Sequence, residues 1–252
     1  MIIGTVALPV WHSKFITWLC LESLCRMNKP KDGWELIIFE EEQGLEQLNE
    51  SFFRSYEGRL KKTGCKRMEY YSAPVKWPLS QKWIYMAVMA SETSEYFCLC
   101  ATDNYYSPFM LQDAEVHIKQ ADWIITTQGY FYDINLDKVI RYDFPSRIGL
   151  QMVAKTEKVR KFPMDIVNKG VDMWFSEQMG YNIMIDPTDH WQQILCTNGM
   201  NTISTERIEF FKNPQPPFYE TIKSLATIVP LDIYSRLKTL HYAKNNSNNY
   251  SL

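Results

Sequence analysis

The stretch EYFCLCATDNYYSP, residues 95–108, places a short apolar run directly before a single carboxylate, Asp103. The run at 96–101 has the length and apolar character of a buried strand. An amide, two tyrosines and a proline follow the carboxylate at once. Because ligands of open α/β sheets bind beyond the carboxyl ends of strands, the segment after this strand is the first candidate for a binding site.

Upstream of this stretch, strand-like and helix-like segments alternate. The expected strands are 2–10, 34–40 and 65–72, and the expected helices are 13–27, 45–62 and 79–92. Ser13 is the expected N-cap of the first helix. With the fourth strand at 96–101, this alternation predicts an α/β fold built on a mainly parallel sheet that is covered by helices.

Three of the predicted strand ends carry polar or aromatic residues. They are the segments 9–12, 40–42 and 102–106. If the three strands are neighbours in a parallel sheet, their carboxyl ends share one edge. We therefore expect these segments, which are far apart in the sequence, to converge on one crevice.

The second half of the chain mixes shorter segments. A helix is expected at 107–121, extended chain at 122–134, a strand at 138–144, and a short helix, a stop at Gly180 and a strand within 170–185. Prolines interrupt regular structure at 213–218. A helical tail is expected at 231–243, and its narrow stripe of Ile233, Leu237 and Leu240 predicts docking on the core.

Composition and charge exclude several classes of protein. The 252 residues carry a formal net charge of −2, so no face needs to be basic and nucleic acid is not expected as a partner. The first ten residues are too short for a signal peptide or a membrane span, and no later apolar run has spanning length. The six cysteines form no CxxC pair, which is typical of reduced core cysteines in a cytoplasmic protein. The four histidines form no HExxH motif, so a zinc site is not expected.

The order of elements and four local motifs make residues 1–205 resemble family 2-like glycosyltransferases of the GT-A fold. The first motif is ALPVW, residues 7–11, before a helix that carries CLESL, and the resemblance implies that Pro9 and Trp11 contact a nucleotide. The second is WELIIFEEE, residues 34–42, where Glu40 is implied to bind the nucleoside, with Glu41 as its competitor. The alternative for this acidic run is a solvated loop.

The third motif is the opening stretch. The family signature has two acids that flank one residue, and Tyr105 and Pro108 place Asp103 at the second acid. Ala101 stands where the first acid belongs, and Asn104 where a further acid is common. The resemblance implies that Asp103, Asn104 and Tyr105 line the site of the nucleotide and of a Mn²⁺ or Mg²⁺ ion. A nucleotide diphosphate supplies most oxygen ligands to such an ion, so one protein carboxylate suffices.

The fourth motif is GVDMWFSEQMGYNI, residues 170–183. The family carries an acidic pair here, and the resemblance makes Asp172 the catalytic base, with Val171 in place of the first acid. The alternative is a helix N-terminal acid that the helix dipole favours. The resemblance also suggests His190 as a ligand of metal or diphosphate, and Lys82 as a phosphate contact. The alternatives are a structural histidine and an exposed lysine.

The resemblance implies a Rossmann-like GT-A catalytic domain at 1–212, with a nucleotide-binding half at 1–108 and an acceptor half at 109–212. A C-terminal helical extension with a frayed tail would occupy 213–252. The implied reaction is inverting transfer of a sugar from a nucleotide-diphosphate donor, with a UDP-sugar as the default, to the hydroxyl of a glycan or another acceptor. Aromatic rings would stack on the sugar, with Tyr105 and Tyr106 walling the crevice; the other ring candidates are Trp77, Trp83, Tyr130 and Tyr132.

Two other functions stay open. A nucleotidyltransferase shares the alternation of strands and helices, but LPVWHSKF, residues 8–15, lacks the glycines of a phosphate loop. A degenerate, non-catalytic module that binds a sugar or a partner is suggested by Ala101 and Val171, which stand where the family has acids. The identity of the acceptor and a homo-oligomeric state are left open by the sequence.

Overall fold

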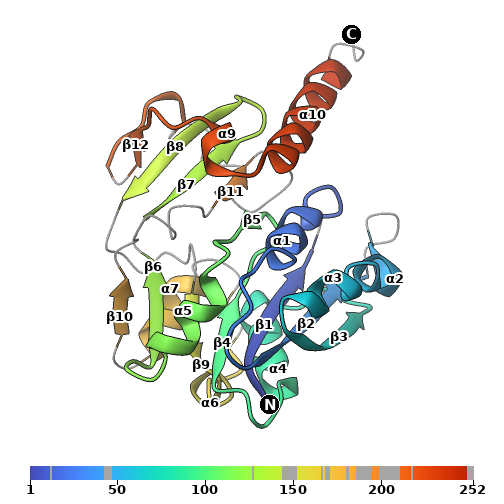
Figure 1. Cartoon of the computed structure of the whole chain (residues 1–252), viewed down its shortest axis with the longest axis vertical. Coiled ribbons are helices and arrows are strands. Elements are labelled where there is room, and N and C mark those ends of the chain that lie inside the picture. The colour runs from blue at the N-terminus through green and yellow to red at the C-terminus, as the bar shows by residue number, and fades with distance from the viewer. Residues whose placement is uncertain are drawn as a thin grey trace.

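The structure is a computed structural model that describes most of the chain. The described residues are 1–11, 13–42, 47–126, 128–143, 152–165, 167, 171–179, 182–185, 195–198, 211–216 and 218–248. They form a seven-stranded and a five-stranded sheet with helices packed on them (Figure 1). The predicted α/β fold class is confirmed.

The first half of the chain alternates strands and helices as the sequence predicts. Its elements are β1 (Ile2–Val10), α1 (Thr17–Leu24), β2 (Gly33–Glu41), α2 (Asn49–Arg54), α3 (Glu57–Lys62), β3 (Cys65–Ala73), α4 (Leu79–Met89), β4 (Tyr96–Leu99) and β5 (Asn104–Tyr105). Strands β4, β1, β2 and β3 lie side by side in that order and are parallel. Their carboxyl ends therefore share one edge of the sheet.

The second half completes the first sheet and builds most of the second. Its elements are α5 (Met110–His117), β6 (Trp123–Thr126), β7 (Gln128–Asp133), β8 (Lys138–Asp143), β9 (Met152–Lys155), α6 (Thr156–Val159), α7 (Val171–Gln178), β10 (Asn182–Ile185), β11 (Leu195–Asn198), β12 (Phe218–Glu220), α9 (Leu225–Ile228) and α10 (Leu231–Asn248). The first sheet has the order β10-β6-β9-β4-β1-β2-β3, and β9 is antiparallel to both of its neighbours. The sheet is thus mixed but mainly parallel, as predicted. The second sheet has the order β12-β8-β7-β11-β5.

The extended chain predicted at 122–134 is two strands in two different sheets. Strand β6 pairs with β9 and β10 in the first sheet, and β7 pairs with β8 and β11 in the second. Likewise, the helix predicted at 45–62 is replaced by the two short helices α2 and α3. Extended or helical character is a local property, whereas the choice of sheet depends on partners distant in sequence.

Helix α1 begins at Thr17, and the prediction that Ser13 is its N-cap is wrong. No side chain caps this helix. The carbonyl oxygen of Ser13 instead accepts the backbone N–H groups of Ile16 and Thr17, both at 2.9 Å. The segment thus forms a turn before the helix.

Apolar layers cover both faces of the first sheet, because side chains alternate along each strand. Val6 and Leu8 belong to the layer that includes residues of α1, α3 and α5. Ala7 and Phe39 belong to the opposite layer, with residues of α4 and α7. All residues of β2 are buried, which is typical of a central strand covered on both faces.

A third apolar cluster joins the tail helix to the rest of the molecule. Ile233 and Leu237 of α10 are 1% and 0% exposed and pack with Trp18 of α1 and Tyr132 of β7. Arg26, which follows α1, forms an ion pair of 2.5 Å with Asp232. The predicted docking of the tail on the core is confirmed, and Figure 1 shows α10 beside the second sheet.

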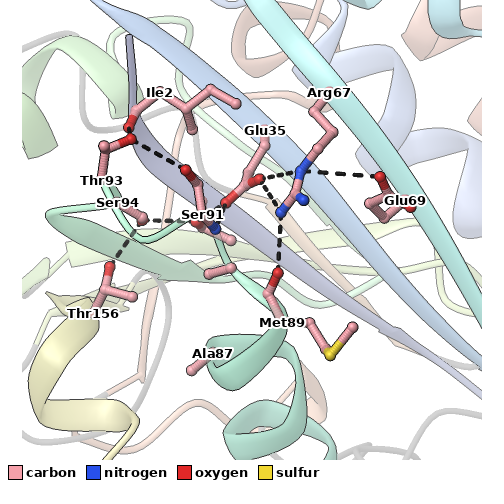
Figure 2. Close-up of polar contacts among 12 residues, drawn as sticks. Ile2, Glu35, Arg67, Glu69, Ala87, Met89, Ser91, Thr93, Ser94 and Thr156 are labelled. Atoms are coloured by element: carbon pink, nitrogen blue, oxygen red, sulfur yellow. Dashed lines mark hydrogen bonds and ion pairs between the residues drawn. The ribbon is translucent and has the colours of Figure 1, made fainter.

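A buried polar network stabilises the amino-terminal halves of the strands (Figure 2). Glu35 of β2 is fully buried, and its carboxylate accepts hydrogen bonds from Thr5 and from the backbone N–H of Ser91, each at 2.7 Å. Arg67 of β3 donates to the other oxygen from Nε and Nη2, both at 2.6 Å. Because every partner belongs to a different segment, this ion pair fixes the relative positions of β1, β2 and β3 at the end opposite the candidate site.

The five cysteines whose side chains are described are free, and four of them are buried. Among the described residues, no helix combines the length and the apolar character that crossing a membrane requires.

Candidate functional site

The three strand ends singled out in the sequence do lie along one edge. In the register of β1 and β2, Pro9 stands beside Phe39 and Val10 beside Glu40. On the other side of β1, Ala7 pairs with Leu99 of β4, and the carbonyl of Ala7 accepts the N–H of Cys100 at 3.0 Å. For the described residues, the strands that lead to segments 9–11, 40–42 and 102–106 thus end along one edge of the sheet, as predicted.

Asp103 lies where the chain passes from the first sheet to the second. It is half-buried in the turn between β4 and β5. The hydroxyl of Tyr106, beneath this turn, accepts the N–H of Ala101 at 2.7 Å and the Asn104 side-chain amide at 3.3 Å. Tyr106 therefore holds both ends of the turn that carries the carboxylate.

The two tyrosines after Asp103 do not wall a crevice as predicted. Tyr105 is 3% exposed and Tyr106 is 1% exposed. Tyr105 packs in the cluster that contains α10, and Tyr106 packs in the layer beneath α1 and α5. Rings of this size stabilise a core most when fully buried, so both contribute packing rather than an open stacking face.

The resemblance implies that Asp103 holds the metal ion. No group of three or more His, Cys, Asp and Glu side chains lies close enough to hold an ion within the part of the chain that the structure describes. Asp103 alone fits an ion whose other ligands are diphosphate oxygens and waters. It does not fit a metal that stays bound without the nucleotide. His190, the other predicted ligand, lies outside the described residues.

Glu40 is engaged in holding the local backbone. It is 1% exposed, and its carboxylate accepts the N–H groups of Leu48 at 2.7 Å and of Asn49 at 3.0 Å. The hydroxyl of Tyr70 donates a third hydrogen bond at 2.8 Å, and burial together with this carboxylate raises the pKa of Tyr70 to about 12. Glu40 thus fixes the start of α2 against β3. The alternative of a solvated acidic loop is wrong for Glu40 and for the equally buried Glu41.

Glu41 and Lys82 form a buried ion pair. Their charged atoms are 2.6 Å apart, and the residues are 2% and 4% exposed. Glu41 also accepts the backbone N–H of Trp77 at 2.7 Å. Burial lowers the pKa of Lys82, and the hydrogen bond that its ammonium donates to Glu41 opposes this shift. The alternative of an exposed lysine is therefore wrong, and Lys82 anchors α4 to the end of β2.

The segment 74–78, which we call the cover segment, folds back from β3 over the ends of β2 and β1. Its Trp77 ring lies 5.1 Å from the ring of Phe39. The ammonium of Lys76 lies 4.3 Å from the centre of the Trp11 ring. Lys76 was not among the predicted site residues, although a lysine beside a tryptophan between two prolines after a strand is a recognisable signal.

Asp172 is half-buried in the first turn of α7. Helix α7 packs against α4, and the rings of Trp83 and Phe175 are 5.6 Å apart in an edge-to-face contact. Trp83 is 8% exposed and belongs to this core contact. Neither Asp172 nor Asp103 is sealed in the interior, which is the minimum that a reacting carboxylate requires.

The order and direction of the strands match the GT-A fold. Comparison of the sequence with protein-family models and with curated proteins finds no match. The fold is shown by comparison with solved structures.

A crystal structure of S. aureus TarS 1–349 is similar over 100% of this chain and 75% of that chain, with a TM-score of 0.58 and 13% identity. Mannosyltransferase PcManGT from Pyrobaculum calidifontis, in complex with GDP-Man and Mn²⁺, is similar over 99% of this chain and 75% of that chain, with a TM-score of 0.57 and 11% identity. In another S. aureus TarS structure, also 13% identical with a TM-score of 0.58, the match covers 78% of this chain and only 37% of that chain.

Proposed function

We propose that this chain is an inverting glycosyltransferase that moves a sugar from a nucleotide-diphosphate donor to an acceptor hydroxyl. The observation that carries the proposal is the meeting of three parallel strand ends at one edge of a GT-A fold, with Trp11 directly after β1 and Asp103 in the turn that follows the adjacent β4. Solved structures of this fold include TarS with UDP-GlcNAc and PcManGT with GDP-Man and Mn²⁺. These complexes support a nucleotide sugar as donor, and UDP-sugars are the first to test.

On the donor side, Pro9 and Trp11 would line the nucleotide, together with Asn104. Asp103 would hold a Mn²⁺ or Mg²⁺ ion that arrives with the diphosphate. Such an ion neutralises the charge of a departing diphosphate. The contribution of the chain is to keep the Asp103 carboxylate at the strand end, and the buried Tyr106 hydroxyl supports this by fixing the turn.

On the acceptor side, Asp172 would accept the proton of the incoming hydroxyl as the sugar is transferred. Direct displacement by that hydroxyl inverts the anomeric centre. The support for this role is that Asp172 is partly exposed at the start of a helix that is packed firmly through Phe175. The acceptor is a glycan or another molecule that presents a hydroxyl.

Calorimetric titration tests the proposal most directly. UDP and GDP would be titrated with and without Mn²⁺ into the parent chain and into Asp103→Ala. We expect one nucleotide to bind more tightly when Mn²⁺ is present, and this gain to disappear in Asp103→Ala. Absence of binding by both nucleotides under both conditions contradicts the proposal.

A second candidate is a non-catalytic module of the same fold. It is favoured by Ala101 and Val171, which stand where the resemblance expects acids, and by the lack, among the described residues, of any group of three or more side chains that could hold a metal ion. Release of free sugar and of UDP from UDP-GlcNAc, or of GDP from GDP-Man, distinguishes the two functions, because a binding module leaves both donors intact.

A further inference from the structure

We propose that Lys76 binds the diphosphate of the donor and that its ammonium rests over the Trp11 ring before the donor arrives. This inference rests on the proposed function and names a recognition residue for it. Lys76 is exposed, and its ammonium lies over the Trp11 ring, 4.3 Å from the ring centre. Trp11 directly follows β1, the strand between β4, which leads to Asp103, and β2.

The cover segment that presents Lys76 is attached at two points. The backbone N–H of Trp77 donates to Glu41 at 2.7 Å, and the Trp77 ring packs 5.1 Å from Phe39 and 5.6 Å from Tyr85. These contacts hold the residue next to Lys76 against β2 and α4. The lysine side chain therefore starts from a fixed position and extends from β3 across β2 to the end of β1.

The charges nearby leave Lys76 as an uncompensated cation. Lys82 is neutralised by Glu41, whereas no Asp or Glu among the described residues lies within ion-pair distance of Lys76. The two ammonium groups are near enough for Lys76 to contribute to the lowered pKa of Lys82, after burial as the main cause. A site with one excess positive charge, exposed to solvent beside an aromatic face, suits an anionic ligand.

A diphosphate is the anion that this position fits best. Among the described residues no group of three or more His, Cys, Asp and Glu side chains could hold a metal ion, so an ion at Asp103 would be held weakly and the diphosphate would keep part of its charge. A cation–π contact at an exposed site is weak, so an ammonium leaves the ring readily for a phosphate oxygen. Lys76 would then neutralise the diphosphate from the side of β1, opposite the turn that carries Asp103.

The experiment measures binding along a series of ligands with increasing phosphate charge. Each titration is done without metal and with Mn²⁺. The ligands are uridine, UMP, UDP and inorganic pyrophosphate, with GDP as the alternative nucleotide. The variants are Lys76→Met, which keeps the side-chain length, and Lys76→Arg, which keeps the charge. Lys62→Met, which removes an exposed charge from α3, is the matched control.

We expect Lys76→Met to weaken the diphosphate nucleotide and pyrophosphate by about tenfold, the loss typical of one charge-assisted contact. Uridine should bind unchanged, UMP should lose less than UDP, and Lys76→Arg should bind within about twofold of the parent. Equal binding of UDP or GDP by parent and Lys76→Met overturns this inference and leaves the proposed function standing. A parent that binds neither nucleotide refutes both.

Discussion

Breaking the buried pair of Glu41 and Lys82 should destabilise the protein and loosen the cover segment. The charged atoms are 2.6 Å apart and both residues are less than 5% exposed, so solvent does not screen the interaction. Removing one partner of such a pair costs about 3–5 kcal/mol because the other charge stays buried. We expect about 3 kcal/mol for Glu41→Gln, whose amide oxygen still accepts the N–H of Trp77. Lys82→Met should lose a similar amount.

The loss should depend on pH in a defined direction. Burial lowers the pKa of Lys82 below its ordinary 10.5, and the hydrogen bond and charge of Glu41 partly restore it. Without Glu41 the folded-state pKa falls further, so at high pH the unfolded chain binds more protons than the folded chain. Stability of Glu41→Gln should therefore rise relative to the parent as pH increases toward 10.5. The deficit should be largest at neutral pH, below the folded-state pKa.

Urea unfolding of the parent, both single variants and the double variant Glu41→Gln/Lys82→Met measures this coupling. A neutral pair of similar volume replaces the ion pair in the double variant, so we expect it to recover most of the stability that either single variant loses. Glu42→Gln, the neighbouring exposed acid, serves as the control and should change stability by less than about 0.5 kcal/mol. Single variants that lose under about 1 kcal/mol, with additive effects in the double variant, would refute the reasoning.

Three further changes have defined outcomes. Asp172→Asn should abolish sugar transfer while its nucleotide affinity stays within about twofold of the parent's. Glu177→Gln on the same helix is the control and should keep activity. Equal turnover by Asp172→Asn and the parent removes Asp172 from the role of base. Tyr106→Phe should lower the free energy of unfolding in urea by about 1–3 kcal/mol, because the Asn104 amide and the N–H of Ala101 lose an acceptor. Mn²⁺-dependent nucleotide binding should weaken as well. An unchanged unfolding midpoint contradicts this prediction. Gly4→Ala should destabilise the protein by about 1–3 kcal/mol, because an added Cβ would lie 2.2 Å from the buried Tyr96 ring. Gly58→Ala in α3 has open space around it and should be neutral or stabilising. Equal melting temperatures for the two variants contradict the packing argument.

Much of the architecture was predictable from the sequence because the signals are local. Apolar runs of strand length predicted strands at 2–10 and 96–101, and the structure has strands at 2–10 and 96–99. Helical spacing between the runs predicted helices there, of which the one at 45–62 is divided into α2 and α3. The stripe on the tail helix predicted its docking, which Ile233 and Leu237 confirm. Even the gathering of strand ends at one edge followed from alternation, since parallel neighbours leave their carboxyl ends together.

The partners of the polar side chains followed from the tertiary structure alone. Three consecutive acids at 40–42 look alike in sequence, yet Glu40 holds the start of α2, Glu41 pairs with Lys82, and Glu42 stays exposed. Alternation along β2 turns successive side chains to opposite faces, and each face carries a different set of neighbours. Tyr105 and Tyr106 are likewise buried by contacts with distant segments, although they were predicted to wall a crevice.

The sequence by itself therefore determined the type and order of the elements, because hydrophobic periodicity and chain propensity act over a few residues. The tertiary structure decided that Lys76 is exposed beside Trp11 whereas Lys82 is buried against Glu41. It also decided in which sheet each half of 122–134 pairs. These outcomes depend on strand register and on packing between segments that are remote in the chain, and no local pattern encodes either.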